Sequence, residues 1–436
     1  MVASSTWREG LALVVSDQSN PPGFYVLAKI WMMVGGDSEV WLRLLPCVLG
    51  IAVGPVALRF FTVLGIGWYG RLIGTGLVAT SPLLVHWSVE FRGYAAFMLA
   101  MAIACTLTAQ IILADREPTR AMWWSLWAAL SAAIMFQYFA ALTAVAIVIA
   151  AIWTGRFPRR FFVAAGVGPL LVFLPWATAV ALEMRKSTAF APDISWIPLP
   201  TLSGIAALPA SFIGGSDPMV LRWAAAAMTV ALVGWGMSNA FRRTNAQPST
   251  GVYRLLVPLV VLPVLVALVA SWVLPRSVWV VRYLMAVAVP FVALIALAID
   301  TRPRGQRVLL ALAAAWMVAV SVPEAYRPLP FKTEWRRLTH ELTDGGSTPA
   351  TVYAFEGYLS LPLTYYVGRD QLPLVIRTSF SEPPSTDAAW VLYRTRPEME
   401  SGLTAAAAEA QFVPGPPRTD SRDSTLMLRR LTRPSP

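Results

Sequence analysis

The sequence predicts an all-α polytopic membrane protein with a small C-terminal α/β domain, and two observations lead to this fold class. First, the chain of 436 residues is 56% hydrophobic and only 14% charged, which is far more apolar than ordinary soluble domains. Second, apolar runs long enough to cross about 30 Å of hydrocarbon, roughly 17 to 25 residues each, recur through the first three quarters of the chain. After residue 323 the runs become short and polar residues dominate.

The apolar runs predict about ten membrane-spanning helices. They lie at residues 41–63, 70–86, 93–113, 121–136, 138–154, 161–182, 219–240, 255–273, 282–299 and 307–323. The stretch 121–154 can also be interpreted as one long helix, but Phe136-Gln137-Tyr138 is typical of a tight turn. This choice matters because the loss of one turn would invert every later helix.

Arginine is distributed unevenly among the predicted loops. One set of alternate loops contains Arg71, Arg116, Arg120, Arg156, Arg159, Arg160, Arg242, Arg243, Arg254, Arg302 and Arg304, and the opposite short loops contain far fewer basic residues. Because positively charged loops stay in the cytoplasm, the opposite segments are predicted to face outward. These segments are 1–40, 87–92, 183–218, 274–281 and 324–436. The net charge of +11 then reflects topology and requires no nucleic-acid partner.

The chain is expected to divide into an outer loop with an interfacial helix (1–40), a transmembrane helical domain (41–323) and an extracytoplasmic α/β domain (324–436). In the first region, Pro21-Pro22 predicts a helix start, and the roughly 12 residues after it are too few to span a membrane. This helix is expected to lie in the membrane interface, with Phe24, Tyr25 and Trp31 as anchors.

The C-terminal region shows the alternation of an α/β domain. Apolar runs lie at 351–355, 372–376, 389–393 and 426–428, and helical patterns lie near 333–343, 357–367 and 397–409. This alternation predicts a domain of about 100 residues in which strands pack against helices. The tail after Pro414 is rich in proline, serine and arginine and is expected to fray.

Three outward segments contain the residue types that chemistry at a lipid surface needs. Ionisable groups at a membrane edge are costly unless they are hydrogen-bonded or hydrated, so they often mark function. Arginine in particular binds phosphate oxygens through its planar fork. The candidate residues are Asp17, Asn20, Pro21 and Pro22 in the first segment, Glu90, Arg92 and Tyr94 in the second, and Arg276, Arg282 and Tyr283 in the third.

The charged candidates also have structural interpretations. Glu90 could form an ion pair with Arg92 that shapes its loop, and Arg282 could anchor a lipid headgroup. Asp17 precedes two prolines, where a turn or helix-capping role is common. The sequence contains no cluster of cysteine and histidine, and its two histidines exclude an all-histidine metal site.

Short motifs in a fixed order along nearly the whole chain resemble those of family 39 glycosyltransferases. The motifs are Asn20-Pro21-Pro22-Gly23-Phe24-Tyr25, Gly36-Asp37-Ser38-Glu39, Leu42-Arg43-Leu44-Leu45-Pro46, Ser81-Pro82, Glu90-Phe91-Arg92-Gly93-Tyr94, Val281-Arg282-Tyr283-Leu284 and Lys332-Thr333-Glu334-Trp335-Arg336. This family contains bacterial relatives of protein O-mannosyltransferases and of the aminoarabinose transferases that modify lipid A.

The resemblance implies a GT-C fold in the bacterial cytoplasmic membrane, with the active site on the outer face. It implies inverting transfer of a sugar, mannose-like or another hexose or pentose, from a polyprenyl-phosphate donor to a lipid, glycan or protein acceptor. Arg282, with Arg276 and Arg92, would bind the lipid phosphate. Glu90 would orient the acceptor or hold a divalent cation, and the remaining candidate residues would complete the substrate site.

The sequence departs from the family pattern in two places. The family usually has His-Pro-Pro where this chain has Asn20-Pro21-Pro22. It also opens with a transmembrane helix and an outer-loop Asp-Glu pair that supplies the catalytic base, whereas only 20 residues precede Pro21 here. We therefore expect a missing N-terminal helix, with Asp17 as the nearby carboxylate that could replace the base.

Two other interpretations of function stay open at the sequence level. A transporter or flippase for a lipid-linked sugar would also need charged residues in the membrane, although such proteins place them near the bilayer midplane and often in repeated halves. An inactive, truncated homologue would explain the missing acidic pair.

Overall fold

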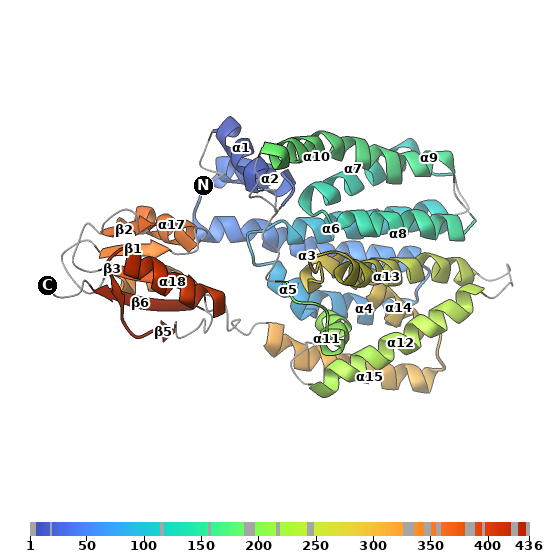
Figure 1. Cartoon of the computed structure of the whole chain (residues 1–436). Coiled ribbons are helices and arrows are strands. Elements are labelled where there is room, and N and C mark those ends of the chain that lie inside the picture. Colours follow the sequence, from blue (N-terminus) through green and yellow to red (C-terminus); the bar gives the residue numbers. More distant parts are fainter. Residues whose placement is uncertain are drawn as a thin grey trace. The chain divides into compact units, whose positions relative to one another are not determined.

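The chain forms two units, Met1–Tyr326 and Arg327–Pro436, and each is considered by itself. The structure is a computed structural model. It describes residues 6–17, 20–113, 117–155, 158–186, 197–214, 219–241, 248–325, 335–343, 350–354, 359–379, 389–394, 397–419 and 426–432. The first unit is a helical bundle and the second contains a mixed sheet (Figure 1). The predicted fold class, an all-α membrane bundle followed by a small α/β domain, is confirmed.

The apolar runs of the first unit become a series of helices. They are α1 (Trp7–Asp17), α2 (Gly23–Gly35), α3 (Glu39–Val63), α4 (Trp68–Thr80), α5 (Pro82–Trp87), α6 (Tyr94–Leu113), α7 (Arg120–Phe136), α8 (Ala140–Trp153), α9 (Arg159–Phe162), the π-helix η1 (Val163–Val167), α10 (Gly168–Lys186), α11 (Leu202–Ile213), α12 (Met219–Phe241), α13 (Pro248–Val273), the 3₁₀-helix η2 (Val281–Val287), α14 (Ala288–Asp300) and α15 (Arg304–Ala325).

Six helical segments within the described residues are long and apolar enough to cross a membrane. They are Glu39–Val63, Tyr94–Leu113, Arg159–Glu183, Arg222–Phe241, Thr250–Val273 and Val281–Asp300, and each coincides with one of the ten predicted spans. The other four predicted spans are also helical, but α7 and α8 are shorter, with 17 and 14 residues. The turn expected at Gln137 is present, where the backbone is extended (φ −156°, ψ 127°).

The predicted span 70–86 is wrong as a continuous helix. It is interrupted at Ser81, so that α4 has only 13 residues and α5 only six. The ring of Pro82 disfavours the helical conformation at the residue before it, and Ser81 accordingly has ψ 117°. The sequence analysis also missed two helices, α1 and α11.

Long-range contacts place the predicted loops at two ends of the bundle. At one end, the backbone N–H of Gly67 donates to Oδ2 of Asp300 (2.8 Å). At the other end, Arg282 donates to the hydroxyl of Tyr94. Each contact joins two segments that the arginine distribution assigns to the same side of the membrane. The direction in which the bundle faces stays a prediction.

Small residues allow the helices to approach closely. In α4, a Cβ atom at Gly70 would lie 2.8 Å from the carbonyl oxygen of Ala296, and one at Gly74 would lie 3.2 Å from the Cβ atom of Ala296. Gly70 and Gly74 therefore form the surface on which α14 packs, as small residues do between membrane helices. Gly76, on the same helix, faces open space.

The second unit has a six-stranded sheet in the order β2-β1-β3-β6-β4, with β5 also on β6. Its elements are α16 (Trp335–Glu341), β1 (Ala350–Ala354), α17 (Ser360–Asp370), β2 (Leu374–Arg377), β3 (Ala389–Arg394), α18 (Pro397–Glu409), β4 (Val413–Pro414), β5 (Arg418–Thr419) and β6 (Leu426–Thr432). Strands β2, β1 and β3 are parallel, and β6 is antiparallel to β3. The strands and helices predicted from the sequence are present in the expected order.

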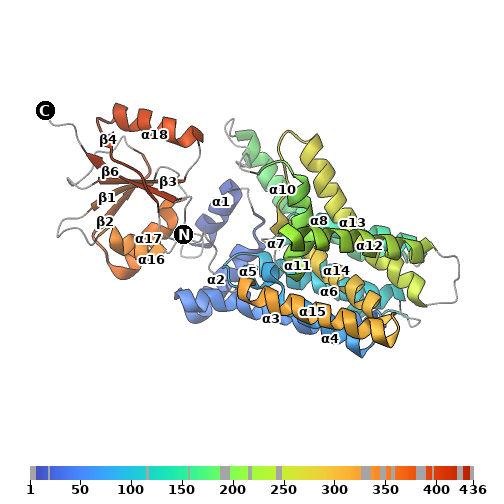
Figure 2. The same ribbon diagram turned by 90° about the horizontal axis from the view of Figure 1, so that it is seen from below.

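Alternating side chains of the strands form two cores on the two faces of this sheet. Val352 of β1 packs with Leu338 and Leu363 from α16 and α17. The next residue, Tyr353, packs with Leu403 of α18, because successive side chains of a strand point to opposite faces. Figure 2 shows α16 and α17 on one side of the sheet and α18 on the other. The expectation that the tail frays after Pro414 is wrong for β6, which runs along the whole of β3.

The two glycines of α4 give a matched test of the packing against α14. We expect Gly70→Ala to destabilise the protein by about 1–3 kcal/mol, because the new methyl group would overlap a backbone carbonyl. Gly76→Ala should instead stabilise α4 by about 0.5–1 kcal/mol, because alanine loses less entropy in a helix. Thermal unfolding in detergent measures both. Equal shifts of the two variants would contradict the close approach of α4 and α14.

Candidate functional site

The short loop that follows α5 forms one side of the candidate site. After α5 ends, the hydroxyl of Ser88 donates to the carbonyl oxygen of Leu84 (2.6 Å), and the N–H of Arg92 donates to the carbonyl oxygen of Glu90 (2.7 Å). These bonds fold residues 88–93 into a tight loop that leads directly into α6. A Cβ atom at Gly50 of α3 would lie 2.1 Å from the hydroxyl oxygen of Ser88, so the loop lies close against α3.

The centre of the site is the guanidinium group of Arg282 on η2. Its Nε atom donates to the hydroxyl oxygen of Tyr94 (3.0 Å). Its Cζ atom lies 5.4 Å from the ring centroid of Trp87 and 5.1 Å from that of Tyr283, within the range of cation–π attraction. The hydrogen bond and the rings fix the plane of a charged group that is half-buried in the bundle.

The aromatic rings around Arg282 also contact one another. The ring of Trp87 meets that of Tyr94 edge to face, with centroids 4.5 Å apart, and Tyr283 lies 6.5 Å from Tyr94 and 4.8 Å from Phe139. We call these five residues the Arg282 cluster. They come from α5, α6, η2 and the turn between α7 and α8, so segments far apart in the sequence build one rigid arrangement.

The proline segment and the Glu90 loop also meet. The ring of Phe24, just after Pro22, contacts the ring of Phe91 edge to face at 5.2 Å, and a Cβ atom at Gly93 would lie 3.2 Å from the Cβ atom of Phe24. Phe24 is only 8% exposed. Its predicted role as an interfacial anchor is therefore wrong, because it packs inside the protein.

A pair of tryptophans holds α2 against α3. The indole Nε1 of Trp31 donates to the carbonyl oxygen of Trp41 (2.7 Å), and Nε1 of Trp41 donates to the carbonyl oxygen of Trp31 (2.9 Å). The two rings are stacked, with centroids 4.3 Å apart. A Cβ atom at Gly35 would lie 2.1 Å from the ring of Trp41. Because α2 is fixed in this way, the proline segment at its start has a defined place beside the Glu90 loop.

The structure brings three predicted binding residues, Tyr94, Arg282 and Tyr283, into direct contact. The other candidates lie on the predicted segments. Asn20 and Glu90 are half-buried, Pro21 is buried, Pro22 is the N-cap residue of α2, and Arg92 and Arg276 are exposed. Asp17 is the last residue of α1, and its side chain lies outside the described residues. The roles assigned to these seven residues stay predictions.

The sequence analysis left Trp87 and Phe139 out of the candidate set. Trp87 lies in the outward segment 87–92 that precedes Tyr94, and an aromatic residue at this predicted membrane edge is a usable signal. Phe139 follows the Gln137 turn, and only the fold reveals its contact with Tyr283. Among the described residues, no three His, Cys, Asp or Glu side chains gather in a way that could hold a metal ion.

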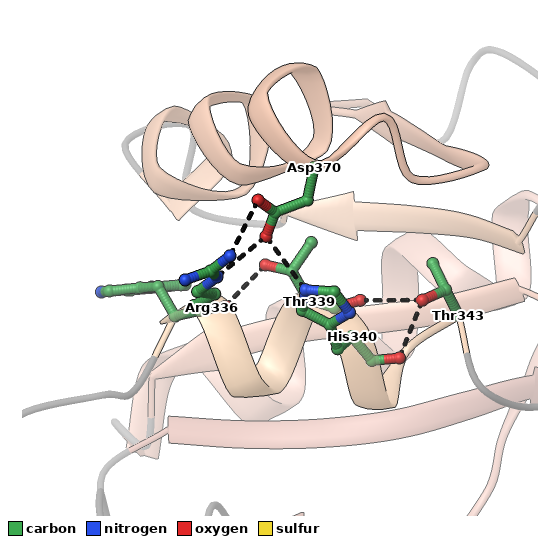
Figure 3. Close-up of polar contacts among 6 residues, drawn as sticks. Arg336, Thr339, His340, Thr343 and Asp370 are labelled. Carbon is green, nitrogen blue, oxygen red and sulfur yellow. Dashed lines mark hydrogen bonds and ion pairs between the residues drawn. The ribbon is translucent and has the colours of Figure 1, made fainter. Parts of the chain in front are cut away.

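A second polar cluster lies on the C-terminal unit, between α16 and α17 (Figure 3). Arg336 donates to both carboxylate oxygens of Asp370 (3.0 and 3.2 Å), and Nε2 of His340 lies 2.9 Å from Oδ2 of the same residue. Asp370 ends the helix that precedes β2, so the cluster lies at the amino end of the parallel strands. Ligands of open α/β sheets bind at the carboxyl ends. We therefore interpret the cluster as a clasp between two helices.

Comparison with known proteins was made by sequence and by structure. No protein-family model and no curated protein matches the chain. Among solved structures, ArnT from Cupriavidus metallidurans in the apo state matches with a TM-score of 0.53 and 13% identity, over 94% of this chain and 87% of that chain. ArnT bound to undecaprenyl phosphate matches equally well. An oligosaccharyltransferase from Archaeoglobus fulgidus matches with a TM-score of 0.48 and 12% identity, over 95% and 64%.

These likenesses define the class of the protein by its fold. The helical bundle with its small C-terminal unit is a GT-C membrane fold, as the order of motifs implied. ArnT is one of the proteins with this fold to which the chain is similar. At 13% identity this similarity concerns the fold and carries no activity with it.

The clasp between α16 and α17 predicts how the stability of the C-terminal unit depends on pH. Hydrogen bonds from Arg336 and then from His340 lower the pKa of the Asp370 carboxyl from its usual value. A lowered pKa stabilises the folded state above the unfolded-state pKa, and this stabilisation is lost as the pH falls through the lower, folded-state value. As the pH falls below the usual pKa of an aspartate, about 3.9, amide hydrogens of α16 should therefore lose protection.

Hydrogen exchange of the full chain, followed by mass spectrometry, measures this loss. Asp370→Asn should show faster exchange in α16 at neutral pH and a weaker dependence on pH, because the amide cannot be neutralised. Arg337→Gln, on the same helix, is the control for removal of a nearby charge. The same acid-dependent loss in Asp370→Asn as in the wild type would contradict the role of the clasp.

Proposed function

We propose that this chain is a membrane glycosyltransferase that moves a sugar from a polyprenyl-phosphate donor to a lipid, glycan or protein acceptor of the cell envelope. Transfer takes place on the outer face of the bacterial cytoplasmic membrane and inverts the anomeric carbon. The observation that carries the proposal is the guanidinium of Arg282, held by Tyr94 at one end of a GT-C bundle. An arginine fixed in this way is suited to bind a phosphate at the lipid surface.

The comparison with solved structures supports the choice of donor. ArnT, which shares this fold, has been solved with undecaprenyl phosphate bound. A polyprenyl phosphate is an anion with a long apolar tail, and it suits a site where an arginine stands among aromatic rings at the end of apolar helices.

In the proposed reaction, the acceptor oxygen forms a bond to the anomeric carbon while the bond from that carbon to the phosphate oxygen breaks. The electron pair of the broken bond leaves with the lipid phosphate, so negative charge grows on this group. Arg282 stabilises that charge, and Arg92 and Arg276 are further candidates from neighbouring segments. Fixed charges that face a developing anion act without reorganisation, which makes them effective.

The acceptor hydroxyl must lose its proton during the attack. A carboxylate that accepts the proton typically contributes about 10²- to 10⁴-fold to the rate. Glu90 is half-buried on the loop that leads to Tyr94, so it can orient the acceptor next to the bound phosphate. Asp17, in the first segment, is the carboxylate that would accept the proton in place of the family's acidic pair.

Donor binding is the first test, because it does not depend on which group is the base. The purified chain should bind undecaprenyl phosphate, measured by native mass spectrometry, and Arg282→Ala should weaken binding by at least tenfold. Arg254→Ala is the matched control, since Arg254 also donates through Nε, to the carbonyl oxygen of Ala240 (2.9 Å), in a segment assigned to the opposite side. Absence of binding by the wild type would overturn the proposal.

Transfer separates the role of Arg282 in catalysis from its role in binding. With a panel of polyprenyl-phosphate sugars in nanodiscs, Arg282→Lys should lower turnover about 10- to 100-fold and weaken donor binding only several-fold, because a point charge replaces a planar fork. Tyr94→Phe should act in the same direction but less strongly, since it removes only the hydrogen bond that orients the guanidinium. Unchanged turnover in Arg282→Lys would favour the alternative interpretation, in which Arg282 anchors a lipid headgroup.

Topology is tested with single cysteines at two exposed glycines. A Cβ atom at Gly305 or at Gly402 would face open space, so both positions accept a cysteine, in a background where Cys47 and Cys105 are alanine. In intact cells, an impermeant thiol reagent should label Gly402→Cys on the C-terminal unit and leave Gly305→Cys protected. Labelling of both positions, or of Gly305→Cys alone, would contradict the outward orientation.

A further inference from the structure

We propose that the end of the bundle opposite the Arg282 cluster has a binding site for an anionic phospholipid, built by α4, α12 and α15. The site is formed by five residues, which we call the Arg302 cluster: Tyr69, Arg71, Trp235, Arg302 and Arg307. This inference is independent of the proposed function, because it concerns a different end of the bundle and a different ligand.

The arginines of this cluster are held in place. Arg307 donates through Nε and Nη2 to the carbonyl oxygen of Arg302 (3.3 and 3.1 Å). Its Cζ atom lies 6.0 Å from the ring centroid of Tyr69, and the Cζ atom of Arg302 lies 5.9 Å from that of Trp235. The Arg307 guanidinium is therefore tied to the backbone of Arg302, and each of the two guanidinium groups lies against an aromatic ring. Two fixed positive charges on neighbouring segments favour the binding of an anion at this end.

The charge of this end is strongly positive. Arg71 follows Tyr69 on α4, its Nη1 atom donates weakly to the hydroxyl oxygen of Thr62 (3.4 Å), and its Nε atom is buried without a hydrogen-bond partner in the structure. One carboxylate at this end belongs to Asp300. Both of its oxygens face Gly67, and one accepts the N–H of that residue. Asp300 thus binds the start of α4 and leaves an excess of arginine.

Apolar side chains continue from the Arg302 cluster along the bundle. Trp68, Tyr69 and Leu72 on α4, and Leu309, Leu312 and Trp316 on α15, are all more than half exposed. The three residues of α15 are spaced by three and four positions, so they form one face of the helix. α4 and α15 pack against each other. A charged end with exposed aromatic residues beside an apolar surface matches a phospholipid headgroup with its acyl chains.

An excess of arginine at one end of a membrane protein also arises from topology alone, so the site needs a feature that scattered charges lack. That feature is the arrangement of Arg302 and Arg307: Arg307 donates to the backbone carbonyl oxygen of Arg302, and each guanidinium lies at cation–π distance from a ring of a different helix. Exposed arginines such as Arg159 and Arg160 on α9 are assigned to the same side, and α9 packs on η1 rather than on α4 or α15. They provide a matched comparison.

The experiment uses the full chain, delipidated in detergent and titrated with phosphatidylglycerol or phosphatidylcholine of the same acyl chains, with bound lipid measured by native mass spectrometry. The wild type should retain phosphatidylglycerol in preference to phosphatidylcholine. The double variant Arg302→Gln and Arg307→Gln should weaken phosphatidylglycerol binding roughly 25-fold, about fivefold for each arginine. The control, Arg159→Gln with Arg160→Gln, removes the same charge and should bind as the wild type does.

Three results would overturn the site. The first is an equal loss in both double variants, which would assign binding to general surface charge. The second is no loss in either. The third is displacement of the lipid by an equal concentration of inorganic phosphate, which would indicate a site for a soluble anion. If the double variant does not fold, the single variant Arg302→Gln, which leaves the contacts of Arg307 in place, should weaken binding about fivefold; wild-type affinity in that variant would also overturn the site.

Discussion

The hydrogen bond between Arg282 and Tyr94 is the contact on which one end of the bundle, the end with the Arg282 cluster, depends. A guanidinium among apolar helices is costly unless its charge is met by hydrogen bonds and polarisable groups. Here the hydroxyl of Tyr94 accepts from Nε, and the rings of Trp87 and Tyr283 lie within cation–π distance. These partners come from three separate elements. The bundle must therefore bring α5, α6 and η2 together before the charge can be accommodated.

The same end contains irregular backbone around η2, and this irregular backbone has its own hydrogen bonds. Where η2 follows an extended segment, the N–H of Tyr283 donates to the carbonyl oxygen of Val280 (2.9 Å), and the N–H of Val278 donates to the hydroxyl of Ser271 (3.1 Å). Non-helical backbone at membrane depth is tolerated only where such partners exist. The breaks at Ser81 and Gln137 interrupt the helices near this end. Residues that follow the two breaks, Trp87 and Phe139, contact Arg282 and Tyr283.

How far the fold could be predicted depends on the range of the contacts involved. The length of an apolar run is a local property, so the positions of most helices followed from the sequence, including the turn at Gln137. The break at Ser81 was also local, because Pro82 marks it, but a continuous apolar run concealed it. The pairing of β6 with β3 joins segments separated by a helix, and composition alone suggested a frayed tail instead.

The candidate site could likewise be predicted where its residues have a local signal in the sequence, and not where they depend on long-range contacts. Arg282, Tyr94 and Tyr283 were chosen because ionisable and aromatic residues stood at predicted membrane edges, and the fold places them in contact. The contribution of Phe139 was not predictable, because nothing near it in the sequence points to η2. The stacked pair of Trp31 and Trp41 was missed for a different reason. Single tryptophans near a membrane usually mark the interface, and here each is bonded to the backbone of the other.

Both ends of the bundle hold arginines against aromatic rings but with different degrees of enclosure, and this difference separates the two proposed roles. Arg282 is half-buried behind a tyrosine that is only 5% exposed, so an anion that reaches it must displace little water and is held in one orientation. Arg302 is exposed, and it lies beside an apolar face that stays open to lipid. An enclosed arginine favours a reaction in which charge develops at a fixed point. An exposed one favours a ligand that exchanges with the surrounding membrane.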